Sequence, residues 1–440
     1  MSAVWLRGGV ILTVDAQRRV LQGDVLVEDG KISALGDVKA PAGATIIDVS
    51  GQVVMPGLVQ AHTHLCQTLC RGAADDLPLL TWLKERIWPW EAALDEKSMR
   101  ASARLAIAEL LLSGTTSILD MGSVHETDAI ADEVARSGLR ATIGKAMMDS
   151  GEGVPSRLCE TTKASLDESD RLAQRWTGQA DDRVRYAYAP RFVLSCTEAL
   201  LREVAARVQR GARLHTHASE QLPECELVRK ERGMDNISYF HSLGLVGGRS
   251  ALAHCVHPTI IERDLLASTG AHVVHCPSSN LKLGSGIAPI PEMLAQGISI
   301  ALGADGAPCN NNLDGFMELR LAALLHKHRA GTDALPAGQA LVLATVNGAR
   351  AIGRGDEVGS LEVGKRADLI VVDLAQPHIA PSPDPTSAIV YAAQSRDVRH
   401  VFVDGRQLVN NGVLTELTGL ERGAVVAQAI SEAKRVRARL

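Results

Sequence analysis

"MPGLVQAHTHLCQTLCRG", residues 55–72, places two histidines one residue apart at the end of an apolar run. In a β-strand the side chains repeat every second residue, so His62 and His64 would point to the same side. The pair alone does not decide between two metal ligands and two histidines packed in a core. A chance His-x-His is common in a chain with 14 histidines.

Further apolar runs of strand length follow this one through the middle of the chain. They are residues 116–122, 140–149, 184–192, 212–220, 251–257, 271–279 and 298–306. Between them, amphipathic patterns predict helices, for example residues 98–114 and 196–211. Eight strand–helix units over roughly 300 residues are typical of a TIM barrel. We therefore expect an α/β protein with a (β/α)8 TIM barrel over residues 56–362.

The two ends of the chain have a different pattern. Residues 1–55 contain short strand-like segments separated by Asp-Gly and Gly turns, and residues 359–374 and 397–413 repeat this pattern. Two β-rich ends around a different middle predict that the termini meet. We expect residues 1–55 and 363–440 to form one small composite β-sandwich domain.

Composition narrows the class of protein. The 440 residues are 46% hydrophobic and 22% charged, with a formal net charge of −5. This net charge does not favour binding to nucleic acid or to an anionic membrane. The apolar runs are too short to span a bilayer. The eight cysteines form no Cys-x-x-Cys pair, and no secretory signal precedes them. These features predict a reduced, cytoplasmic protein.

In a barrel of this kind the active site lies at the C-terminal ends of the strands. Histidines or acidic residues stand at the ends of several of the predicted strands: His62 and His64, His215 and His217 with Glu220 after them, His254, and Asp305. A catalytic Zn²⁺ is held by imidazole nitrogens and carboxylate oxygens, with one position left for water. His62, His64, His217 and Asp305 would supply that set, with Fe²⁺ as the alternative metal.

Some positions leave alternatives open. His215 faces the same way as His217, one layer deeper, and could support a ligand, pack, or be a ligand itself. A two-metal site bridged by a carbamylated lysine is the rival arrangement, but the predicted fourth strand has no lysine. Lys145 lies in the third strand, where an ordinary packed side chain is the simpler interpretation. One divalent ion is favoured.

The motifs "PGLVQAHTH", "HASE", "AHCVH", "CPSSNLKLGSG" and "LGADGAPCNNN", and the later "GSLEVGKRADLIVVD", resemble the amidohydrolase superfamily. The resemblance is to its branch of purine-type deaminases and triazine hydrolases. It implies that His62, His64, His217 and Asp305 hold the metal and that Glu220 and His254 carry protons together with Asp305. It also implies a small-molecule purine substrate, close to His217, and a homo-oligomer.

Two sets of motifs bear on the substrate. "DDLPLLTWLKERIWPWEAAL" and "GEGVPSRL" resemble segments of 5′-methylthioadenosine and S-adenosylhomocysteine deaminases, where Glu91 would contact sugar hydroxyls and Arg157 the sugar or 5′ side. "GKAMMD" and "YAYAPRF" are more similar to guanine deaminase, where Arg191 would contact the base.

Deamination of an adenosine-type nucleoside to the inosine analogue and ammonia is our first expectation. The substrate would be 5′-deoxyadenosine, 5′-methylthioadenosine, S-adenosylhomocysteine or adenosine. A guanine or oxopurine deaminase is second, and an s-triazine amino- or chlorohydrolase third. Hydrolysis of a cyclic amide and a catalytically silent binding protein are the alternatives from other classes.

Overall fold

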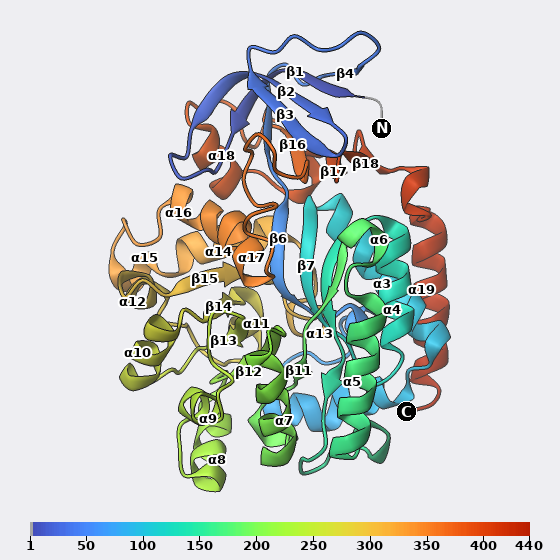
Figure 1. Cartoon of the computed structure of the whole chain (residues 1–440), viewed down its shortest axis with the longest axis vertical. Helices are drawn as coiled ribbons and strands as arrows, with labels where there is room; N and C mark the ends of the chain where they lie inside the picture. Colours follow the sequence, from blue (N-terminus) through green and yellow to red (C-terminus); the bar gives the residue numbers. More distant parts are fainter. Residues whose placement is uncertain (1–2) are drawn as a thin grey trace.

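The computed structural model describes residues 3–440, and most of them form a closed (β/α)8 barrel (Figure 1). Its strands are β6 (Leu58–Thr63), β7 (Thr115–Met121), β8 (Arg140–Gly144), β9 (Ala146–Met147), β10 (Val184–Tyr186), β11 (Ala189–Pro190), β12 (Leu214–Ala218), β13 (Ser250–His254), β14 (His272–His275) and β15 (Ser299–Leu302). The predicted third and fourth strands are each split: β9 continues β8 after Lys145, and β11 continues β10 after a two-residue break. All pairings within the barrel are parallel.

Two half-sheets, in the orders β10-β8-β7-β6 and β12-β13-β14-β15, close into one barrel at two seams. At one seam Tyr188 pairs with Leu214, and at the other Thr63 pairs with Asp305. At the second seam the Asp305 amide donates to the His62 carbonyl at 3.1 Å. A Cβ on Gly303 would lie 2.8 Å from that carbonyl oxygen, so the close approach of β15 to β6 requires a glycine.

Helices cover the outside of the barrel. They include α3 (Glu96–Leu112), α4 (Thr127–Ser137), α5 (Thr162–Trp176), α7 (Glu198–Gln209), α8 (Leu222–Arg232), α9 (Asn236–Ser242), α10 (Ile260–Thr269), α11 (Pro277–Lys282), α12 (Ile290–Ala295), α14 (Gly315–Leu325), α16 (Ala337–Val342) and α17 (Gly348–Ala351). Side-chain caps fix the starts of two of these helices: Asp95 accepts from the Ser98 amide and Thr197 from the Leu200 amide. No helix among residues 3–440 combines the length and the apolar character needed to cross a bilayer.

Strands from both ends of the chain form one nine-stranded sheet, in the order β19-β18-β17-β16-β5-β1-β2-β3 with β4 beside β1. Their bounds are β1 (Val4–Leu12), β2 (Val20–Glu28), β3 (Lys31–Gly36), β4 (Thr45–Asp48), β5 (Gln52–Pro56), β16 (Leu369–Asp373), β17 (Val398–Val403), β18 (Arg406–Asn410) and β19 (Val413–Leu414). Antiparallel pairing of β5 with β16 joins the two ends. The protein is thus a TIM barrel with a small β-sandwich domain.

The last helix, α19 (Arg422–Arg437), packs along α3 of the barrel rather than on the sheet (Figure 1). Arg435 holds Asp95, the residue that caps α3, through two bonds of 2.6 Å. The division into residues 1–55 plus 363–440 and residues 56–362 stays a prediction.

A buried arginine joins the barrel to the β-sandwich domain. Arg140, the first residue of β8, donates to Asp368 at 2.7 and 3.0 Å and to Asp404 at 2.6 Å, and its side chain is fully buried. Asp368 directly precedes β16, and Asp404 lies in the turn between β17 and β18. The interaction therefore fixes the barrel on strands from the C-terminal end of the chain.

We predict that Arg140→Met lowers the free energy of unfolding by about 3–5 kcal/mol, because it leaves the buried Asp368 carboxylate without its ion pair. Arg136→Met is the matched control, since the Arg136 side chain is 68% exposed and its pair with Asp132 lies at the surface. The control should change stability by about 1 kcal/mol at most. Urea unfolding followed by circular dichroism measures both, and equal losses would contradict the role of Arg140.

Candidate active site

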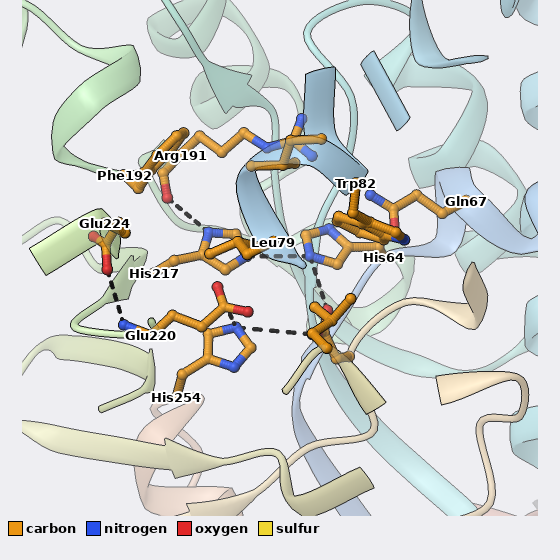
Figure 2. A pocket seen from close by; sticks show the side chains of 13 residues that line it. His64, Gln67, Leu79, Trp82, Arg191, Phe192, His217, Glu220, Glu224 and His254 are labelled. Atoms are coloured by element: carbon orange, nitrogen blue, oxygen red, sulfur yellow. Dashed lines mark hydrogen bonds and ion pairs between the residues drawn. The ribbon is translucent and has the colours of Figure 1, made fainter. Parts of the chain in front are cut away.

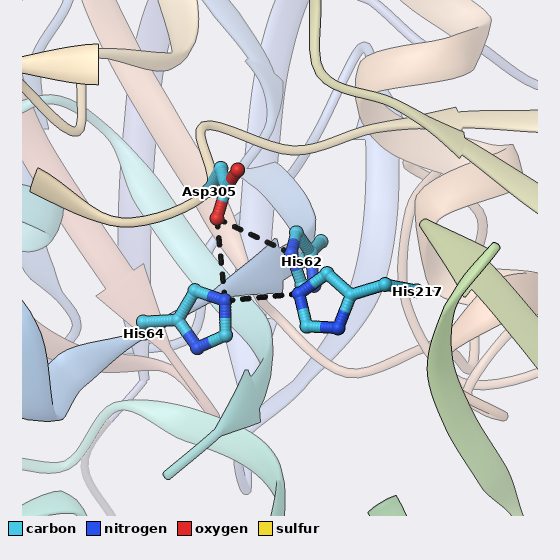
Figure 3. A group of neighbouring side chains, drawn as sticks. All are labelled: His62, His64, His217 and Asp305. Carbon is cyan, nitrogen blue, oxygen red and sulfur yellow. Dashed lines mark hydrogen bonds and ion pairs between the residues drawn. The ribbon is translucent and has the colours of Figure 1, made fainter. Parts of the chain in front are cut away.

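Four side chains that can bind a metal converge at the C-terminal ends of the barrel strands (Figure 3). His62 and His64 come from the end of β6 and the residue after it, His217 from β12, and Asp305 from the loop after β15. One Asp305 carboxylate oxygen lies 3.3 Å from His62 Nε2 and 3.2 Å from His64 Nε2, and the Nε2 atoms of His64 and His217 are 3.3 Å apart. All four ligand atoms lie within 4.8 Å of one another.

Each imidazole is held through its Nδ1 atom, so that Nε2 faces the centre of the group. His64 Nδ1 lies 2.7 Å from the Met121 carbonyl, and His217 Nδ1 lies 2.7 Å from the Arg191 carbonyl. His62 Nδ1 lies 2.7 Å from His215 Nε2. His215 therefore supports a ligand instead of belonging to the group, which decides between its alternatives. Supports of this kind fix the tautomer and orientation of histidine ligands.

The arrangement fits a metal ion on its own geometry. His62 Nε2 is buried and has no hydrogen-bond partner among the described residues, a costly state for an isolated imidazole nitrogen. Three neutral imidazole nitrogens and one carboxylate oxygen are the donor types that Zn²⁺ takes in catalytic sites. Lys145 forms a buried ion pair with Glu160 and takes no part in the group. One ion is therefore favoured over a lysine-bridged pair.

Glu220 and His254 lie beside the ligands His64 and His217 (Figure 2). His254 Nε2 is 3.5 Å from Glu220 Oε2 and 3.8 Å from Asp305 Oδ2, and its Nδ1 lies 2.9 Å from the Asn280 side-chain oxygen. Burial raises the pKa of Glu220 to about 7. A carboxyl group with a pKa near neutral pH can both take and return a proton, which suits a proton carrier.

The backbone around these groups is strained. Ser219, which precedes Glu220, has φ of 50°, while His254 and Asp305 have φ of 72° and 64°. These values lie in the left-handed region that residues other than glycine rarely adopt. Strain of this kind persists where the surrounding structure over-determines the conformation, and it concentrates at functional sites.

A cavity opens over the site (Figure 2). His64, His217, Glu220, His254 and Asp305 line its polar part. The apolar wall consists of Leu79, Trp82, Leu83, Phe192 and Leu283. Three of these five come from the segment between β6 and α3, in α1 (Leu79–Trp82) and at the start of the π-helical turn Leu83–Ile87 that continues it. Such a space, apolar with a few convergent polar groups, is typical of small-molecule sites.

Arg191 and Glu91, both expected to contact substrate, contact each other instead. Arg191 Nη1 lies 2.7 Å from Glu91 Oε2, and Nη2 lies 3.1 Å from Oε1. Only 4% of the Arg191 side chain and 1% of the Glu91 side chain is exposed. Arg191 lines the cavity, whereas Glu91 lies behind it in α2 (Trp88–Ala93). A direct contact of Glu91 with a sugar stays a prediction.

Arg157 lies outside the cavity. Its Nη2 atom donates to the Leu94 carbonyl at 2.9 Å, and the residue borders a separate hollow beside His125 and Glu168. In this conformation Arg157 holds the segment that follows α2. Its contact with the 5′ side of a nucleoside also stays a prediction.

The apolar wall was not predicted from the sequence, and neither were the lining residues Gln67 and Glu224. Glu224, in the first turn of α8, accepts the Glu220 amide at 3.0 Å. Gln67 lies three residues after His64, inside the first motif, and Trp82 lies in the segment compared with nucleoside deaminases.

The barrel and its ligand group define a metal-binding hydrolase. The chain belongs to the amidohydrolase family, whose model matches residues 53–408. It is 41% identical over 414 residues to a 5′-deoxyadenosine deaminase of Methanosarcina acetivorans, covering 93% of this chain and 94% of that protein. It is 42% identical over 436 residues to a 5-methylthioadenosine/S-adenosylhomocysteine deaminase of Halobacterium salinarum, covering 98% and 97%.

Among solved structures, the chain is similar to an adenosine deaminase from Xanthomonas campestris with bound zinc. The TM-score is 0.92, the identity is 33%, and the likeness covers 99% of each chain. The expected family and fold class are therefore confirmed.

We predict one equivalent of divalent metal per chain, lost in His217→Ala because a three-ligand remainder binds far more weakly. Elemental analysis of the purified proteins measures this. His241→Ala is the control, since His241 is exposed on α9 and should leave metal content unchanged. Two equivalents in the wild type, or full metal content in His217→Ala, would overturn the single-ion site.

Proposed function

We propose that this protein deaminates an adenosine-type nucleoside, such as 5′-deoxyadenosine or 5′-methylthioadenosine, to the inosine analogue and ammonia. The observation that carries the proposal is the similarity, at about 40% identity over nearly the whole chain, to proteins named for these activities. The chain also keeps a ligand group and two proton carriers arranged around one cavity.

The ion would be held by His62, His64, His217 and Asp305, with zinc proposed from the donor set and from the zinc in the Xanthomonas structure. Such an ion, when bound, lowers the pKa of water from 15.7 toward about 7 and so provides hydroxide at neutral pH. Glu220 would take one proton of the attacking water and deliver it to the ring nitrogen beside the carbon that carries the amino group, while the water oxygen forms a bond to that carbon.

His254 and Asp305 complete the proton transfers. Their side chains lie 3.8 Å apart, and Asn280 fixes the opposite ring nitrogen of His254. His254 Nε2 has no hydrogen-bond partner among the described residues, so it is available to the reacting group. Together the two hold a proton near the departing amino group, which leaves as ammonia.

A guanine or oxopurine deaminase is the second candidate, and Arg191 is the observation that favours it. Arginine carries donors only, so beyond its pair with Glu91 it would meet an acceptor on the substrate. Guanine offers a carbonyl oxygen and ring nitrogens, whereas adenine offers ring nitrogens alone. Three further points stay predictions: activity on an s-triazine, a homo-oligomeric state and a cytoplasmic location.

A substrate panel tests the proposal. Ammonia release should be fastest on an adenosine-type nucleoside when adenosine, 5′-deoxyadenosine, 5′-methylthioadenosine, S-adenosylhomocysteine, guanine and 8-oxoguanine are compared at equal concentrations. A coupled glutamate dehydrogenase assay measures it. Faster turnover of guanine or 8-oxoguanine than of every nucleoside would replace the proposal with the second candidate.

Glu220→Gln should keep its metal and lose about 10²–10⁴-fold in kcat, because an amide cannot transfer the proton. Glu226→Gln, at an exposed position in α8, which follows Glu220, should retain wild-type kinetics. Elemental analysis and steady-state kinetics on the best nucleoside give both readouts. A Glu220→Gln enzyme with normal kcat would assign the proton transfer to another residue.

A further inference from the structure

Both oxygens of the Glu91 carboxylate already accept hydrogen bonds from protein side chains. Its Oε2 atom accepts from Arg191 Nη1, and its Oε1 atom accepts both from Arg191 Nη2 and, at 2.8 Å, from Gln67 Nε2. The carboxylate is neutralised by the guanidinium, buried and absent from the cavity wall. Opening a buried, bidentate pair of this kind is costly, so Glu91 is poorly placed to bind a sugar itself.

Gln67 offers the acceptor that Glu91 cannot. Its side chain lines the cavity, and its Oε1 atom is buried without a hydrogen-bond partner among the described residues. The amide orientation is fixed, because the atom beside Glu91 must be the donor and the other atom is then the acceptor. A buried carbonyl oxygen without a donor is destabilising, and a donor on the substrate would relieve that cost.

Gly306 provides the space for this oxygen. Its backbone is ordinary, with φ of −86° and ψ of 151°, so no conformational reason requires a glycine. A Cβ at this position would lie 2.1 Å from Gln67 Oε1, which any other side chain would displace. Gly306 follows the ligand Asp305, so the free acceptor lies next to the catalytic group.

We propose that Gln67 Oε1 accepts a hydrogen bond from a ribose hydroxyl of the substrate and that Glu91 is a positioning residue acting through Gln67 and Arg191. This inference rests on the proposed function. An adenine nucleoside has only two kinds of donor: the amino group, which must lie at Glu220 and His254 to be released, and the sugar hydroxyls. The hydroxyls are therefore the donors left for Gln67.

The test is a thermodynamic cycle in which one arm changes the Gln67 side chain and the other removes a hydroxyl group from the substrate. kcat/KM is measured for 5′-deoxyadenosine and for its 2′-deoxy and 3′-deoxy analogues, in the wild type and in Gln67→Met, which has similar length and no strong acceptor. In the wild type, removing the hydroxyl that Gln67 binds should cost roughly tenfold. In Gln67→Met the ribo substrate should lose a similar factor, and the ratio of ribo to deoxy substrate should fall to about 1.

Gln52→Met is the matched control. Gln52 also has a buried side-chain oxygen without a partner, but it lies in β5 of the β-sandwich domain. The ratio of kcat/KM for the ribo substrate to that for the deoxy substrate should be the same in Gln52→Met as in the wild type. Glu91→Gln should lower the ratio in the same direction as Gln67→Met, because it loosens Gln67 without removing the acceptor.

If Gln67→Met does not fold, Gly306→Ala replaces it, since the added methyl group displaces the amide while the backbone conformation remains allowed. An unchanged ratio in either folded variant, or a wild type that does not distinguish ribo from deoxy substrates, overturns the inference. Absence of ammonia from every adenosine-type substrate in the wild type is a different result, because it refutes the proposed function itself.

Discussion

The hydrogen bond from the Asp305 amide to the His62 carbonyl closes the barrel, and the site depends on it. It brings the first and the last barrel strand together at the edge where their polar side chains emerge. The close approach requires Gly303, whose missing side chain leaves room for the His62 backbone. The carboxylate oxygen of Asp305 then lies within 3.3 Å of two imidazoles from the opposite side of the seam. The contact that closes the barrel therefore also brings the metal ligands together.

Arg191 couples the ligand group to the wall of the cavity. Its carbonyl oxygen lies 2.7 Å from His217 Nδ1, while its guanidinium is paired with Glu91 behind the wall. Arg191 therefore orients the ligand His217 through its backbone and Glu91 through its side chain. Displacement of the guanidinium would disturb both, since the two parts belong to one residue, directly after strand β11.

The architecture and the ligand group followed from the sequence because both depend on local periodicity. Strand alternation predicts that the side chains of His62 and His64 point to the same side of the strand. It also predicts that the His217 side chain points away from those of Thr216 and Ala218. The helices predicted at residues 98–114 and 196–211 lie at Glu96–Leu112 and Glu198–Gln209 in the structure. The pairing of Arg191 with Glu91 could not be predicted, because it joins residues from different helices and strands through side-chain rotamers. The positions of Arg157 and Gln67 depend on the same kind of long-range packing.

The joint between β5 and β16 has a consequence for how the chain reaches this state. The N-terminal strands cannot complete their sheet until residues 369–373 have left the ribosome, because β16 is the neighbour of β5. Throughout synthesis of the barrel, the nascent chain exposes the backbone groups of β5, an edge that readily pairs with other chains. Contacts of such long sequence separation also form slowly. We therefore expect the first strands to need protection from pairing with other chains during translation.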